Sequence, residues 1–152
     1  MNTDNMSILG LTIDYGPYGW LEDYNPDWTP NTTDAEGKRY RFRNQPDIAL
    51  WNLIQLGNAL YPLIEDVPAM EAILNSYSHR FDAKFPVMMQ EKLGLTSEYE
   101  SDFQDELTTL LTASETDMTI FYRNLANVLK SDTTEIALSK IEYAFYQPDA
   151  LV

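Results

Sequence analysis

The feature that most constrains the fold of this 152-residue chain is an apolar repeat in its middle, at intervals of three and four residues. The repeat consists of Met70, Ile73, Leu74, Tyr77, Phe81 and Phe85. Residues three and four apart lie on the same side of an α-helix, so this spacing places all six side chains on one face. The segment after Pro68 is therefore predicted to be an amphipathic helix.

A preceding helix is predicted to begin with Pro46 at its first position and to run to Leu60, with Pro62 kinking or ending it. Apolar side chains cover most of its circumference, which predicts a helix buried on several sides. Its narrow polar stripe consists of Asn52, Gln55 and Asn58.

Three shorter helices are predicted after Gly94. Their apolar positions are Tyr99, Phe103, Leu107, Leu110 and Leu111, then Met118, Phe121, Tyr122, Leu125 and Leu129, then Ile136, Ile141 and Phe145. Ser114 and Asp117 have the spacing of a capping box, in which a side chain at the helix start accepts a backbone N–H. The same spacing recurs at Asp132 and Glu135, so the two pairs predict where the last two helices begin.

Composition argues against several classes of protein. The chain carries 24 acidic and 10 basic residues, a formal net charge of −14, which opposes binding to nucleic acid and to anionic membranes. It contains no cysteine, which excludes disulfides, thiolate nucleophiles and Cys-ligated zinc. No leader peptide or membrane-spanning run is readable. We therefore expect a soluble, cytoplasmic protein of one domain, with neither nucleic acid nor a membrane as its partner.

The first 45 residues hold four of the six glycines and the pattern with the most chemistry. Two short apolar runs meet at Gly10, which predicts a tight β-hairpin. If the turn centres on Leu9 and Gly10, Asn5 lies opposite Asp14, with their Cβ atoms about 5 Å apart.

An amide oxygen and a carboxylate then converge. Such hard oxygen ligands suit Mg²⁺, which takes one or two protein ligands and completes its octahedron with phosphates and water. Asp4 lies beside Asn5 in the sequence and can accept a proton from an attacking hydroxyl. Similar hairpins occur widely without a metal, so the spacing alone leaves both interpretations open.

Two further patterns favour structure over chemistry. The spacing of a calcium-binding loop is met by Asp23, Asn25, Asp27 and Asp34, but Trp28 stands where that loop requires glycine. A basic cluster, Lys38, Arg39, Arg41 and Arg43, can contact phosphate or RNA; the preferred interpretation is a strand whose alternate residues face solvent and core. The only histidine, His79, is predicted on a helix surface.

The run from Met1 to Gly19, MNTDNMSILGLTIDYGPYG, closely resembles the signature of the SelO family, also called YdiU or UPF0061, which are protein adenylyltransferases with a pseudokinase fold. The likeness continues through Asn31, Asp34, Gly37, Arg39, Tyr40 and Phe42, then Asn44-Gln45-Pro46 and Leu50-Trp51-Asn52-Leu53. It is strong over residues 1–64 and general in character over the helical remainder.

This resemblance implies a mainly α-helical part of the C-lobe of a protein-kinase-like fold, in which a short N-terminal β-hairpin precedes about five helices. Residues 1–45 would form the catalytic-loop and metal-binding segment, and residues 46–152 the helical C-lobe portion. The family transfers AMP from ATP to Ser, Thr or Tyr hydroxyls of proteins.

Carried over residue by residue, the resemblance places Asp14-Tyr15-Gly16 where kinases have their DFG turn. Asp14 would bind Mg²⁺, with Mn²⁺ as an alternative, and through it the phosphates of ATP. Asn5 would be the second metal ligand and Asp4 the catalytic base.

The sequence departs from the family pattern at two places. The family's His-Gly-Val before the motif is missing, and Met1 occupies an interior methionine position, so we expect the groups that cradle ATP to lie outside this chain and the isolated chain to be inactive. Pro30 stands where relatives often carry cysteine, which leaves redox control there in doubt. A bacterial protein of this kind would be cytoplasmic, and a eukaryotic one mitochondrial.

Two alternatives remain open. The same metal-binding pair serves kinases, so the chain can instead be a fragment of a phosphotransferase. It can also be a non-catalytic helical remnant that binds partners, in which case exposed apolar surface would favour self-association.

Overall fold

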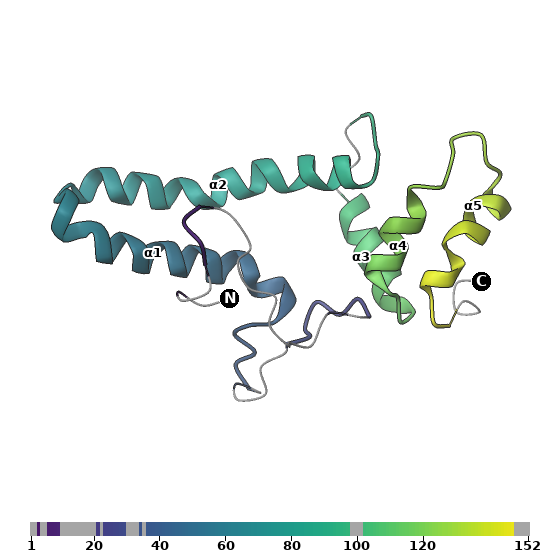
Figure 1. Ribbon diagram of the computed structural model, residues 1–152, viewed down its shortest axis with the longest axis horizontal. Helices are drawn as coiled ribbons and strands as arrows, with labels where there is room; N and C mark the ends of the chain where they lie inside the picture. Colours follow the sequence, from purple (N-terminus) through teal and green to yellow (C-terminus); the bar gives the residue numbers. More distant parts are fainter. Residues whose placement is uncertain are drawn as a thin grey trace. The chain divides into compact units, whose positions relative to one another are not determined.

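The computed structural model describes residues 3, 6–9, 21, 23–29, 34, 36–97 and 102–147 (Figure 1). Helices dominate this part of the chain, and its only β structure is two isolated bridges. In chain order the elements are the 3₁₀ helix η2 (Phe42–Asn44), α1 (Gln45–Ile64), α2 (Val67–Lys92), α3 (Phe103–Ala113), α4 (Met118–Leu125), α5 (Thr134–Ile141) and the 3₁₀ helix η3 (Glu142–Ala144). The prediction of a mainly α-helical chain is confirmed, while the kinase-like fold and the N-terminal hairpin stay predictions.

The chain forms two compact units, each built from two stretches of sequence. Unit 1 comprises Met1–Trp20 and Pro26–Phe85, and unit 2 comprises Leu21–Asn25 and Pro86–Val152. The boundary inside α2 falls at Pro86, where the helix lacks one backbone N–H and the ring crowds the preceding turn. The predicted division between residues 45 and 46 concerns chemical roles and stays a prediction.

In unit 1, α1 and α2 run antiparallel, joined by Glu65 and Asp66 (Figure 1). Helix α1 continues through Pro62 to Ile64, slightly beyond the predicted stop. It ends because Glu65 adopts a left-handed conformation with φ of 53°, from which its N–H donates to the carbonyl oxygen of Tyr61 at 2.9 Å.

Helix α2 confirms the helix that the apolar repeat predicted, and it extends beyond the repeat to Lys92. Tyr77, Phe81 and Phe85 stack along one face, with ring centroids 6.3 Å and 5.4 Å apart. The Tyr77 hydroxyl donates to the carbonyl oxygen of Pro46 at 3.1 Å and so ties α2 to the first turn of α1. Burial, and to a smaller extent the carboxylate of Asp47, raises the pKa of the Tyr77 phenol.

The prediction that α1 is buried on several sides is wrong for this structure. Only Ile48 and Asn52 are buried in α1, whereas Leu63 is 81% exposed and Ile64 50% exposed. The reason is that the described residues cover α1 incompletely: hollows of about 280 and 390 Å³ remain between α1 and α2. The two helices contact each other near Gly57, where a Cβ would lie 3.5 Å from the Met70 side chain.

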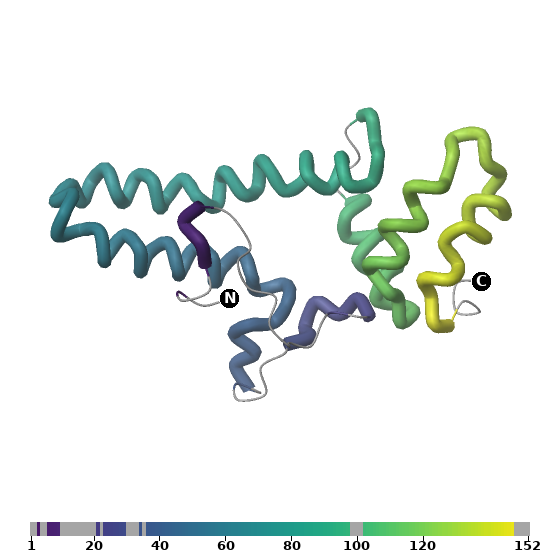
Figure 2. Tube along the Cα trace, viewed as in Figure 1, coloured from purple at the N-terminus to yellow at the C-terminus, as the bar shows by residue number. Residues whose placement is uncertain are grey.

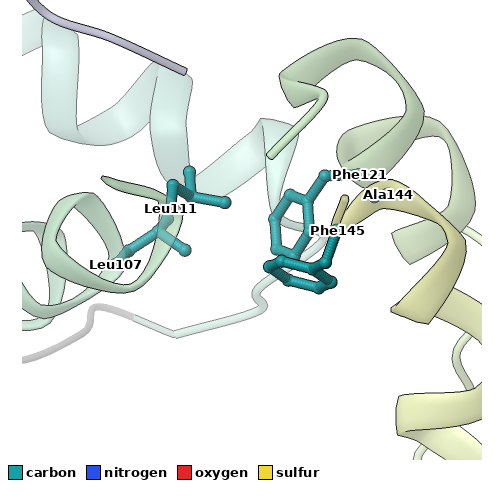
Figure 3. Close-up of a cluster of buried hydrophobic side chains, with 5 residues drawn as sticks. All are labelled: Leu107, Leu111, Phe121, Ala144 and Phe145. Atoms are coloured by element: carbon teal, nitrogen blue, oxygen red, sulfur yellow. The ribbon is translucent and has the colours of Figure 1, made fainter. Parts of the chain in front are cut away.

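Unit 2 closes around a small core. Leu107 and Leu111 of α3 meet Phe121 of α4 and the segment Ala144–Phe145 that follows α5 (Figure 3). The rings of Phe121 and Phe145 lie edge to face with centroids 5.9 Å apart, an arrangement that adds to the burial of their surfaces.

The polar groups beside this core are largely paired. Thr116 is fully buried, and its hydroxyl donates to the carbonyl oxygen of Ser114 at 2.6 Å. The Ser114 hydroxyl in turn donates to the carbonyl oxygen of Gln147 at 3.1 Å. Thr116 also bridges to Phe145, and its carbonyl oxygen accepts the Tyr24 N–H at 2.7 Å, so three separate segments are held together.

The predicted capping boxes are displaced. Helix α4 is capped by Asp117, which accepts the N–H of Ile120 at 2.8 Å, and α5 by Thr133, which accepts the N–H of Ile136. Ser114 and Asp132 do not cap these helices because their side chains bond elsewhere. Among the described residues, no helix has the length and apolar character needed to cross a membrane.

Candidate functional site

The residues predicted to carry the chemistry, Asp4, Asn5 and Asp14, lie outside the described residues. Their predicted convergence therefore stays a prediction, as does most of the hairpin. The structure describes the neighbouring segment 6–9, in which Ile8 and Leu9 form a turn and the Leu9 N–H donates to the Ser7 hydroxyl at 3.2 Å.

This segment lies beside α1 (Figure 2). The Nδ2 of Asn52 donates to the sulfur of Met6 at 3.0 Å. Around this contact is a hollow of about 550 Å³, whose lining comes from both sides: Thr3, Met6, Ser7 and Ile8 from the N-terminal segment, and Asn52, Leu53, Gln55, Leu56 and Ala59 from α1. Helix α1 is therefore the platform on which the segment next to the predicted metal ligands rests.

Asn52 is placed by the geometry of α1. It lies one turn after Ile48, so the two side chains share the face of the helix that is covered, and only 4% of Asn52 is exposed. Its Oδ1 is buried and has no hydrogen-bond partner among the described residues. Burying a carboxamide oxygen without a partner costs about 1–3 kcal/mol, so the described surroundings of Asn52 offer its Oδ1 no compensation for burial.

The basic cluster is a folded turn, and the strand predicted there is wrong. The Asp34 carboxylate accepts the N–H groups of Gly37 at 3.1 Å and Arg39 at 2.8 Å. Lys38 has φ of 44°, a left-handed conformation that a strand does not contain. The chain then enters η2 and α1.

Asp27 neutralises part of this cluster. Its Oδ1 lies 2.8 Å from the Arg43 guanidinium and 3.7 Å from Arg41 Nε. The Arg39 guanidinium lies 4.3 Å from the centre of the Trp51 ring, a cation–π contact that ties the turn to α1. Three of the four basic side chains therefore support the structure around the start of α1.

No calcium loop forms from the residues with that spacing. Asp27 binds arginine, and Asp34 binds backbone N–H groups. The described part of the chain contains no group of three or more His, Asp or Glu side chains able to hold a metal ion. His79 is on the exposed surface of α2, as predicted.

Asn52 is the residue that the sequence did not identify as special. Its place in the stripe with Gln55 and Asn58 suggested a polar face, yet Asn52 is buried and Asn58 is exposed. The available signal was an amide between Trp51 and Leu53 in a helix that is apolar on most sides.

Comparison with known proteins identifies the family. A sequence model of the protein adenylyltransferase SelO matches residues 1–148. A protein nucleotidyltransferase YdiU from Flavobacterium johnsoniae is 56% identical over 149 residues, which cover 97% of this chain and 28% of the relative. Proteins of the same name from Rhodopirellula baltica and Aromatoleum aromaticum are 61% identical over 132 residues and 50% identical over 151, covering 84% and 98% of this chain.

The chain spans about a quarter of the length of these relatives, from 24% to 28%. The match nevertheless extends over both compact units and far beyond the N-terminal signature. The chain belongs to the SelO family of protein adenylyltransferases, a family of nucleotidyltransferase enzymes.

Proposed function

We propose that this chain supplies the metal-binding and proton-accepting residues of an enzyme that transfers AMP from ATP to Ser, Thr or Tyr hydroxyls of proteins. The observation that carries the proposal is the family match over residues 1–148. This match supports a catalytic interpretation of residues 4–14, which hairpin spacing alone left open. ATP and hydroxyl-bearing proteins are the proposed partners.

Asn5 and Asp14 are the proposed ligands of Mg²⁺, or of Mn²⁺ in its place. An amide oxygen and a carboxylate fit this hard cation, which also takes phosphate oxygens and water. The assignment of these two residues rests on the family resemblance of the N-terminal run, and the described residues hold no competing group of three or more acidic or histidine side chains. When bound, the ion supplies positive charge beside the phosphates.

Asp4 is the proposed base. The substrate hydroxyl forms a bond to the α-phosphorus of ATP, the bond from that phosphorus to the bridging oxygen breaks, and pyrophosphate leaves. The proton of the hydroxyl passes to Asp4. Residues 1–45 thus carry the chemistry, and the helical residues 46–152 carry the platform, with α1 directly beneath segment 6–9.

A chimera tests this proposal. The chain replaces the matching segment of the Flavobacterium johnsoniae relative, which is 56% identical to it, and is incubated with Mg²⁺ and ATP labelled at the α- or the γ-phosphate. We expect protein labelling from the α-label only. Asp14→Ala and Asp4→Ala should abolish it, whereas Glu36→Ala, which removes an exposed acid in the same part of the chain, should not.

Labelling from the γ-phosphate would establish phosphoryl transfer instead. If the parent relative labels proteins and the chimera does not, the proposal that this chain supplies the metal-binding and proton-accepting residues is refuted. The isolated 152-residue chain, titrated with Mg²⁺ and ATP by calorimetry, shows whether it binds nucleotide by itself, with Asp14→Ala as the control.

Self-association is a second proposed property, favoured by exposed apolar side chains in unit 1. Leu63 and Ile73 are 81% and 66% exposed, on helices that leave hollows between them. Apolar surface of this kind favours association with a second copy. Sedimentation should show dimers or larger species that Leu63→Glu reduces; a clean monomer at high concentration would contradict this.

A further inference from the structure

Asn52 combines burial with poor pairing. It is 4% exposed, and together with Ile48 it forms the only buried pair of α1. Its Nδ2 has a thioether as acceptor, Met6 Sδ at 3.0 Å, and sulfur of this kind accepts only weakly. Its Oδ1 has no partner among the described residues.

A leucine has the same number of side-chain heavy atoms and would bury apolar surface without losing hydrogen bonds to water. The change would leave only the Met6 sulfur without its donor, and a thioether is a weak acceptor whose loss of a partner costs little. Within the part of the chain that the structure describes, the hydrogen bonding of Asn52 therefore adds little to the stability of unit 1. What the amide provides at this position is a contact with Met6 of the N-terminal segment.

The contact to Met6 is the one hydrogen bond that joins α1 to segment 6–9 within the part of the chain that the structure describes. Met6 directly follows Asn5, the proposed metal ligand. Asn5 in turn directly follows Asp4, the proposed base. A side chain that fixes Met6 on α1 therefore restricts, through the backbone, the residue bonded to it. Groups that orient ligands in this way change metal affinity without touching the metal.

We propose that Asn52 is a positioning residue, which anchors Met6 on α1 and so orients Asn5 for metal binding. The inference rests on the proposed function, which gives Asn5 its role. It assigns to α1 a part in the chemistry that goes beyond supporting the fold.

The test uses the 152-residue chain labelled with ¹³C at its methionine methyl groups, of which there are six. Met6→Leu identifies the Met6 signal. Asn52→Leu is compared with Asn58→Leu, which makes the same change at an exposed position of the same helix. Mn²⁺ is titrated, and broadening of the Met6 methyl signal gives the apparent dissociation constant, while urea unfolding gives stability.

We expect Asn52→Leu to weaken Mn²⁺ binding about tenfold or more, as orienting partners of metal ligands do, without lowering the urea midpoint. The Met6 methyl shift should also change before any metal is added. Asn58→Leu should alter neither quantity. An unchanged Mn²⁺ affinity together with an unchanged Met6 signal in Asn52→Leu would overturn the inference.

Met6→Leu gives a second route if Asn52→Leu does not fold. It removes the sulfur acceptor but keeps an apolar side chain, and its Mn²⁺ affinity, measured by calorimetry, should fall in the same direction. Affinity equal to that of the unchanged chain would count against the anchor. Absence of Mn²⁺ binding by the unchanged chain would instead count against a metal site formed by Asn5 and Asp14 without ATP, while the metal-free Met6 methyl shift would still decide whether Asn52 anchors Met6.

Discussion

The two compact units differ in how much apolar core their described residues build. Unit 2 closes its core around Leu111 and Phe121 and pairs the hydroxyl of its fully buried Thr116. In unit 1, Ile48 is the one buried apolar side chain among the described residues, hollows remain between α1 and α2, and Leu63 is exposed. Buried apolar surface is the main source of folding stability, so we expect unit 2 to contribute more to the stability of the chain than unit 1.

The largest expected effect is the contrast between two leucines. Leu111→Ala removes a side chain that is 1% exposed, and should lower the free energy of unfolding by about 3 kcal/mol through lost burial and the cavity left behind. Leu63→Ala, at 81% exposure, should change it by less than about 0.5 kcal/mol. Urea unfolding followed by circular dichroism measures both.

Equal losses from the two changes would mean that unit 1 covers Leu63 in solution, for example in a dimer. Repeating the Leu63→Ala measurement at several protein concentrations separates these cases, because dimer stability depends on concentration.

The sequence predicted those parts of the fold that follow from helical spacing. The repeat from Met70 to Phe85 correctly gave α2, since side chains three and four apart must share a helix face. The sequence did not predict the turn around Lys38, because alternating basic and aromatic residues read as a strand. That turn depends on Asp34 accepting two backbone N–H groups, which single-residue preferences do not encode.

The helix starts and the candidate site also depend on contacts that residue spacing does not reveal. Spacing alone placed a capping box at Ser114, but its hydroxyl bonds to Gln147, far along the chain. The polar stripe of α1 concealed that Asn52 is buried, because burial depends on what packs against the helix. The family resemblance, which rests on the identities of the N-terminal residues, pointed to Asp4, Asn5 and Asp14; the described structure adds Asn52, which contacts Met6, the residue after Asn5.

A pair of glycines offers a sharper comparison of the units. Gly57 in α1 has room for a methyl group, which would lie 3.5 Å from the Met70 side chain, at ordinary contact distance. Gly57→Ala should therefore stabilise by about 0.5–1 kcal/mol, from higher helix propensity and partial filling of the hollow. Gly94 in unit 2 has φ of 70°, so Gly94→Ala should destabilise by about 1 kcal/mol.

Thermal unfolding measures the two glycine variants side by side. Opposite shifts in melting temperature are expected, because the first change relieves a packing defect and the second strains a left-handed residue. A drop in melting temperature for Gly57→Ala would mean that α1 and α2 are already in close contact, and that unit 1 is better packed than the hollows indicate.

The smallest expected effect concerns acid stability within unit 2. The pKa of Asp132 lies below its ordinary value of 3.8, chiefly because its carboxylate accepts a hydrogen bond from Lys140 and, next, from the N–H of Leu129. A carboxyl whose pKa is lowered by folding stabilises the folded state above its unfolded pKa, and this contribution is lost as pH falls through the folded value. The unfolding free energy of the chain should thus decline below pH 3.8, and Asp132→Asn should make the decline shallower.

Glu135 is the necessary control for that measurement, since its pKa is also lowered, first by its own backbone N–H and then by the Thr133 hydroxyl. Glu135→Gln should also make the decline of the unfolding free energy in acid shallower. The double variant should make it shallower than either single change does, because the two carboxyls have different partners. Unfolding followed at several pH values below 4.5, the ordinary pKa of Glu135, resolves the two contributions. If neither variant changes the loss of stability in acid, other carboxyl groups of the chain must cause it.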